Sequence, residues 1–91
     1  MGKNMEKIHV LLDLIVSKDY PFLNMELTKE EFWNLEEYIK QNCFIINREE
    51  KEDNWEYRLE YEFIYKSKML LLKRYKSYTS DYEYFLLRCE K

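Results

Sequence analysis

The stretch Trp55–Lys66, WEYRLEYEFIYK, alternates aromatic or aliphatic side chains with mostly charged ones. A period of two over this length is typical of a β-strand with one buried face and one solvent-exposed face. Two further runs of strand-forming residues follow, at 69–76 and 82–89. The C-terminal half of the chain is therefore predicted to form an antiparallel sheet.

Two helices are predicted before this sheet. Apolar residues recur at helical spacing within 4–18, and Pro21 ends that segment because the residue before a proline avoids the helical region. Thr28 and Glu31 have the spacing of a capping box, which predicts that a second helix begins at Lys29 and runs to about residue 41. The apolar stripe of the second helix is Phe32, Leu35 and Ile39.

These elements predict an α+β fold. Two helices pack on one face of a small antiparallel meander of three to four strands, which includes a short strand at 43–47, and the charged segment 48–54 is expected to be a loop. The turn 66–68 contains no Gly or Asn, which favours a loop longer than two residues. The register is thereby left open by one residue, so that Glu60 faces either Lys73 or Arg74.

Length and composition indicate one domain, spanning residues 1–91. Cys43 and Cys89 are preceded by no signal-peptide pattern, which predicts free thiols and a cytoplasmic protein. No segment has the roughly 20 apolar residues that span a bilayer, so no membrane partner is expected. Abundant Lys, Asn, Ile and Tyr with no Ala suggest an AT-rich coding sequence, such as that of a low-GC bacterium or its phage.

Nothing in the sequence indicates an enzyme. The single His and the two Cys are far apart and match no metal-binding or nucleophile motif. Gly2 is the only glycine, whereas phosphate-binding loops need several. We therefore expect no catalytic residues, no metal and no cofactor.

Charge is unevenly distributed along the chain. Residues 26–62 carry twelve acidic and five basic side chains, whereas 63–91 carry three acidic and seven basic ones. An acidic surface of this kind can occupy a basic groove on another protein and imitate the phosphates bound there. In size and charge the chain is similar to small acidic inhibitors from phages and plasmids, including several anti-CRISPR proteins. The predicted partner-binding residues are Glu49, Glu50, Glu52, Asp53, Trp55, Glu56, Glu60 and Glu62.

The alternative function is a small nucleic-acid-binding regulator. Cations and tyrosines are interleaved in the segment 66–78, where bases can stack on the rings while the cations hold phosphates. The acidic second helix argues against this interpretation because it would repel phosphates. The predicted nucleic-acid-binding residues are Lys66, Lys68, Lys73, Arg74, Tyr75, Lys76 and Tyr78.

The segment Met69–Leu72 interrupts the alternation, since four consecutive apolar residues place apolar side chains on both faces of the strand. The helices can cover only one face of a single sheet. The other face carries either Leu70 and Leu72 or Met69 and Leu71, and must be shielded by a loop, a terminus or another copy. Among these the sequence interpretation favours a homodimer.

Overall fold

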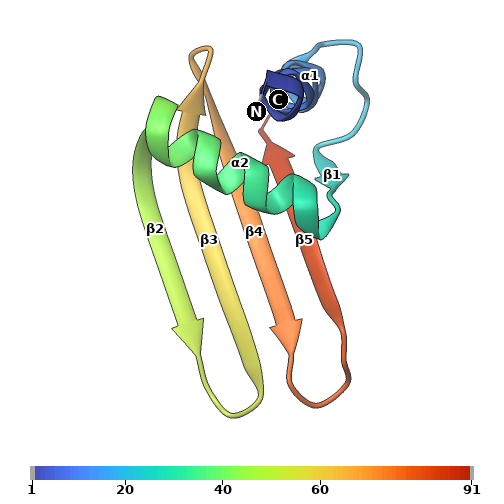
Figure 1. Cartoon of the computed structure of the whole chain (residues 1–91), viewed down its shortest axis with the longest axis vertical. Coiled ribbons are helices and arrows are strands. Elements are labelled where there is room, and N and C mark those ends of the chain that lie inside the picture. Colours follow the sequence, from blue (N-terminus) through green and yellow to red (C-terminus); the bar gives the residue numbers. More distant parts are fainter. Residues whose placement is uncertain (1, 91) are drawn as a thin grey trace.

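The computed structural model describes residues 2–90, with side chains from Lys7 onward. It is an α+β fold of two helices and a five-stranded antiparallel sheet (Figure 1). The helices are α1 (Gly2–Val16) and α2 (Lys29–Asn42). The strands are β1 (Asn24–Glu26), β2 (Phe44–Glu52), β3 (Glu56–Tyr65), β4 (Lys68–Ser77) and β5 (Glu83–Cys89).

The strand order across the sheet is β1-β5-β4-β3-β2. Strands β2 to β5 form a meander, while β1 adds to the opposite edge beside β5. The chain must therefore cross the whole sheet between β1 and β2, and α2 makes this crossing over one face (Figure 1). We call this face the helix side and the opposite face the open side.

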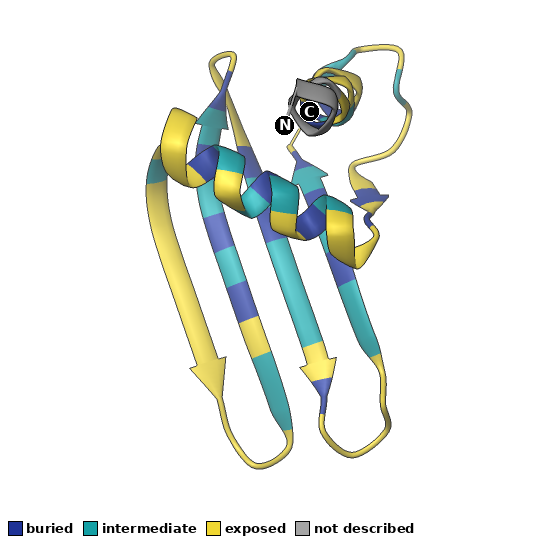
Figure 2. Ribbon diagram, in the orientation of Figure 1, coloured by how far each residue is buried: buried dark blue, intermediate teal, exposed yellow. Residues whose placement is uncertain are grey.

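The core lies between the helices and the helix side. Phe32, Leu35 and Ile39 of α2 are fully buried, as predicted from their spacing. From the sheet, β3 contributes every second residue, including Tyr61 and Phe63, and Figure 2 shows the resulting alternation of buried and less buried residues. The period-two pattern of the sequence is thus confirmed as one face buried beneath the helices.

The start of α2 is also confirmed. The Thr28 hydroxyl accepts a hydrogen bond from the Glu31 amide at 3.1 Å, and the Glu31 carboxylate accepts one from the Thr28 amide at 2.8 Å. This reciprocal capping box satisfies backbone donors that have no partner within the helix. The helix then ends at Asn42, and Cys43 follows in extended conformation.

Three sequence predictions require correction. Strand β1 was not predicted, and β2 extends to Glu52, so most of the expected loop 48–54 is strand. The turn after β3 is a two-residue turn, because Tyr65 pairs with Lys68. Lys66 and Ser67 have φ angles of 48° and 65°, as in a type I′ turn, although neither is a glycine or an asparagine.

The β3–β4 register is resolved. Glu60 lies opposite Lys73, which was one of the two predicted alternatives, and their side chains form an ion pair at 3.6 Å. Leu70 and Leu72 lie on the helix side and are fully buried. Met69 and Leu71 therefore face the open side, where Met69 is 40% exposed.

Candidate functional site

Most of the predicted partner-binding residues lie on one edge of the molecule. We call residues 48–62, which form most of β2, the turn and most of β3, the acidic hairpin. It carries seven carboxylates and three cations. Strand β2 is the outermost strand, and Figure 2 shows that nearly all of it is exposed. Glu49, Glu50 and Glu52 therefore lie on an edge of the sheet, whereas Glu56, Glu60 and Glu62 lie on the neighbouring strand β3.

These carboxylates are divided between the two sides of the sheet. Glu50 lies opposite Leu59, which is buried beneath the helices, so Glu50 and Glu52 are on the helix side. Glu49 lies opposite Glu60 on the open side. The acidic segment that was predicted to be a loop is thus corrected to an edge strand with carboxylates on both sides, whereas the acidic residues of β3 share one side, as their spacing predicted. The carboxylates on the open side are Glu49, Glu56, Glu60 and Glu62.

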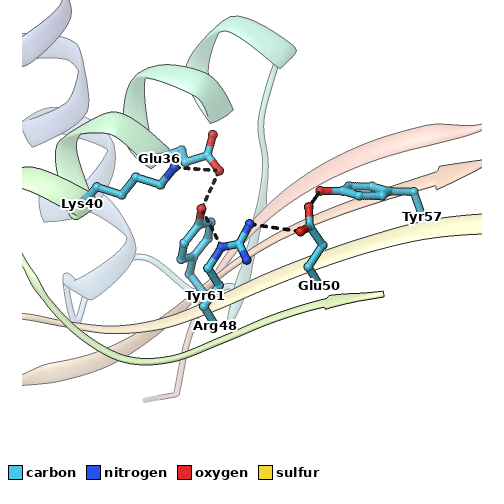
Figure 3. Close-up of polar contacts among 6 residues, drawn as sticks. All are labelled: Glu36, Lys40, Arg48, Glu50, Tyr57 and Tyr61. Atoms are coloured by element: carbon cyan, nitrogen blue, oxygen red, sulfur yellow. Dashed lines mark hydrogen bonds and ion pairs between the residues drawn. The ribbon is translucent and has the colours of Figure 1, made fainter. Parts of the chain in front are cut away.

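On the helix side, a chain of polar contacts connects α2 to the edge strand (Figure 3). The Tyr61 hydroxyl donates to Glu36 of α2 at 2.6 Å and accepts from Arg48 Nε at 3.3 Å. Arg48 Nη2 lies 3.4 Å from Glu50 Oε1, and the Tyr57 hydroxyl donates to the other oxygen of Glu50. This network holds the Glu50 carboxylate in place from two directions.

The turn of the acidic hairpin is ordered by Asp53. Its carboxylate accepts hydrogen bonds from the amides of Trp55 and Glu56 at 2.7 and 2.9 Å. The Trp55 carbonyl accepts from the amide of Tyr78, which ties this turn to the one that follows β4. The Trp55 side chain, which the sequence placed at the start of a strand, lies in the turn and is 67% exposed.

Local contacts lower the pKa values of two of these carboxylates, Glu50 and Asp53. The hydrogen bond from Tyr57, with a smaller contribution from Arg48, lowers the pKa of Glu50 below its ordinary value, although desolvation opposes them. The two backbone amides at the turn lower the pKa of Asp53 in the same way. Burial, together with the bond to Glu50, raises the pKa of Tyr57 to about 12, so its proton stays in place. At neutral pH the edge therefore presents fixed negative charge.

On the open side, two like charges are adjacent. Glu49 and Glu60 are directly opposite each other across β2 and β3, an arrangement that destabilises a sheet. Lys73 offsets the charge of Glu60, and Arg58 forms an ion pair with Glu56 at 2.8 Å. Among the side chains that the structure describes, 7–90, none forms an ion pair with Glu49 or Glu62.

The predicted nucleic-acid-binding residues are not brought together. Lys66 lies in the β3–β4 turn, where it binds Asp13 of α1 at 2.7 Å, and Lys68 begins β4. Tyr78 follows the other end of that strand. Within β4 the side chains alternate between the two sides, with Arg74 and Lys76 on the helix side and Lys73 and Tyr75 on the open side.

A cluster of tyrosines on the open side was missed by the sequence analysis. Tyr75 and Tyr84 stack with ring centroids 5.3 Å apart, and Tyr82 lies within about 6 Å of both rings. With Arg58 and Lys73 they line a shallow hollow of about 410 Å³. The sequence signal was the period-two spacing of Tyr82 and Tyr84, but only the β4–β5 register places them beside Tyr75.

Among the described side chains, which begin at Lys7, no group of three or more His, Cys, Asp or Glu residues is arranged to hold a metal ion. No helix of the described chain is long and apolar enough to cross a membrane. Cys43 and Cys89 are both free thiols, and burial raises the pKa of Cys43. No protein family, curated protein or solved structure matches the chain.

Proposed function

We propose that this protein is a small, non-enzymatic binding factor that uses the acidic hairpin to cover a basic surface of a partner protein. The observation that carries the proposal is the concentration of carboxylates on the exposed edge strand β2 and its neighbour β3, with an exposed Trp55 in the turn that joins them. Tryptophan is enriched among the residues that contribute most to binding in protein interfaces, and charge of one sign speeds association with a partner of the other sign.

The Glu49–Glu60 pair supports a functional origin of this charge. A sheet under selection for stability alone would place a cation opposite Glu60 on β2, as β4 does with Lys73. We extend the proposal to an inhibitor that is encoded by a phage or another mobile element and acts in the cytoplasm. The abundance of Lys, Asn, Ile and Tyr with no Ala favours such a source. Both of these assignments belong to the proposal.

A comparison of variants with equal net charge tests the proposal. One variant reverses three carboxylates of the acidic hairpin, Glu49→Lys, Glu50→Lys and Glu52→Lys. Asp53 is left unchanged because it orders the turn. The control variant reverses three exposed carboxylates elsewhere, Asp19→Lys, Glu26→Lys and Glu37→Lys.

Each protein is immobilised and exposed to bacterial extract, and the retained proteins are identified by mass spectrometry. We expect a basic protein that is retained by the wild type and by the control variant and is lost from the hairpin variant. Retention of the same proteins by all three would contradict the proposal, as would equal loss from both variants.

We also propose a homodimer formed through the open side. Ile64 lies between Phe44 and Met69 in one cross-strand row, with Leu71 nearby. Phe44 is 72% exposed, and no described loop or terminus covers this row. Packing of two open sides would remove the apolar row from water in both copies.

The tyrosine cluster favours a second candidate function, the binding of single-stranded nucleic acid. Aromatic rings on an exposed sheet stack with bases, and Arg58 and Lys73 lie where phosphates would pass. In this second proposal the nucleic-acid-binding surface is the open side, in place of the segment 66–78 that the sequence predicted. Titration of the protein with oligo(dT) measures this binding. We expect Tyr84→Ala to weaken binding because it removes a stacking ring, and the hairpin variant to strengthen it because it replaces three carboxylates by cations.

A further inference from the structure

Strand β2 is a long edge strand, with one register shift between Ile45 and Asn47 and a regular ladder from Asn47 to Glu52. It pairs with β3 along one side only, and no described segment pairs with its other side. The opposite edge strand, β1, has only three residues. A row of unpaired backbone groups on an edge strand is a template for another strand. The edge of β2 thus accommodates a ligand in extended conformation.

The ladder register identifies the outward-facing backbone groups. The amide of Asp53 donates to the carbonyl of Glu56 at 3.1 Å, which fixes the phase of the alternation. Lys51 and Glu49 then direct their backbone groups toward β3. The alternate residues of β2 direct their backbone groups outward, away from the sheet. These residues are Arg48, Glu50 and Glu52.

Charge decides which strand this edge accepts. The segment from Arg48 to Asp53 carries four carboxylates and two cations, and this net negative charge favours a strand with basic side chains. Glu50 and Glu52 both lie on the helix side, two residues apart. A strand whose basic side chains are also two residues apart places both of them beside these carboxylates. At the other end of β2, Phe44 and Ile46 are exposed apolar residues.

We propose that β2 binds a basic, extended segment of the partner protein, which adds to the sheet as a sixth strand. The segment runs antiparallel to β2, with two basic residues separated by one position and an apolar residue about four positions further on. The backbone of the segment bonds to Arg48, Glu50 and Glu52, and its cations face Glu50 and Glu52. This inference rests on the proposed function, because it identifies the part of the partner that the acidic hairpin recognises.

Amide hydrogen exchange with a synthetic peptide tests the inference. The probe is the blocked peptide Lys-Thr-Lys-Thr-Thr-Thr-Val at low ionic strength, with a matched peptide in which Glu replaces Lys. In the free protein the amide of Glu50 should exchange rapidly, and those of Glu49 and Lys51 slowly. At saturating basic peptide we expect exchange at Glu50 to slow at least tenfold, with no change from the acidic peptide. Unchanged exchange at Glu50 would overturn the inference.

Two N-methylated forms of the basic peptide separate strand addition from simple charge attraction. One is methylated at odd positions and the other at even positions, so their charges are identical. In an added strand, only every second amide of the peptide faces β2 and donates to it. The form that is methylated at those positions loses these hydrogen bonds, so it should bind at least tenfold more weakly than the other. Equal binding by both forms would overturn strand addition while leaving the proposed function intact. Retention of the same proteins by the wild type, the hairpin variant and the control variant in the capture experiment would instead refute the proposed function.

Two variants of the protein also separate strand addition from simple charge attraction. Glu50→Gln and Glu50→Pro both remove the carboxylate, but only the proline removes the outward amide. A proline is tolerated on an edge strand where its amide faces solvent. We expect Glu50→Pro to bind the basic peptide at least fivefold more weakly than Glu50→Gln, with circular dichroism confirming that both are folded. Equal affinities of the two folded variants would contradict strand addition.

Discussion

At the scale of single residues, Asp13 shows how the helices are joined to the sheet. Its carboxylate accepts hydrogen bonds from the Tyr65 hydroxyl at 2.6 Å and from Lys66 Nζ at 2.7 Å. Lys66 therefore has a structural role in a turn position that usually holds Gly or Asn. The sequence rule for primed turns failed here because it considers the backbone alone and not this contact with α1.

This contact predicts a pH-dependent loss of stability. Lys66 and Tyr65 lower the pKa of Asp13 below its ordinary value of 3.8. The folded protein therefore binds fewer protons than the unfolded chain in acid, so the stabilisation is present above that value and lost as the pH falls through the folded pKa. Asp13→Asn should melt lower at neutral pH, and its melting temperature should decrease less than that of the wild type between about pH 5 and pH 2.

The control for this experiment is Asp19→Asn, which changes an exposed carboxylate in the turn after α1. It should melt like the wild type across the same range. Thermal melts followed by circular dichroism measure both variants. Identical pH profiles for Asp13→Asn and the wild type would show that the Asp13 contact does not contribute to folding.

The Glu49–Glu60 pair predicts opposite effects on stability and on binding. Glu49→Lys replaces a like-charge pair by a favourable cross-strand pair, which should stabilise the fold by about 0.2–1 kcal/mol. It also removes negative charge from the proposed binding edge, so association with the partner should slow. Denaturant unfolding and binding kinetics measure the two effects. A variant that is destabilised and binds normally would contradict our account of this residue.

At the scale of elements, the success of the sequence analysis followed the strength of each pattern. Strand β3 and helix α2 were predicted because each has one apolar face against the core, which leaves a clear period in the sequence. Strand β1 has only Met25 as a buried residue, too little to define a period. Most of β2 is exposed on both sides, so residues 48–52 had the composition of a loop.

Helix α2 offers a test of how its cap and its core face contribute to stability. Thr28→Ala removes the N-cap bond and should destabilise the fold by about 0.5–2 kcal/mol. Phe32→Ala empties a fully buried site and should cost more, about 3–5 kcal/mol. Denaturant melts compare the two variants. If Phe32→Ala proved no more harmful than Thr28→Ala, α2 would not be the element that closes the core.

At the scale of the whole molecule, the structure concentrates the acidic residues on one edge and leaves one side of the sheet uncovered. The sequence predicted the excess of negative charge within 26–62, because charge can be counted without a fold. It could not show that alternate residues of β2 face opposite sides. The tyrosine cluster was missed for the same reason, since it depends on the β4–β5 register.

The uncovered side predicts association. Sedimentation should show a dimer at high protein concentration, because two apolar rows around Ile64 and Met69 would be removed from water together. Met69→Lys should shift the protein toward the monomer, whereas Lys68→Glu, at an adjacent exposed position, should not. A wild-type monomer at every concentration would contradict the homodimer.

The central claim, that the acidic hairpin is the binding edge, is tested most directly by the rate of association with the captured basic partner. Reversal of Glu49, Glu50 and Glu52 to Lys should reduce this rate at least tenfold, and added salt should slow the wild type, because exposed charges steer encounters and salt screens them. The charge-matched control variant should associate normally. The claim is contradicted if the reversed hairpin associates at the wild-type rate while Lys73→Ala and Lys76→Ala abolish binding.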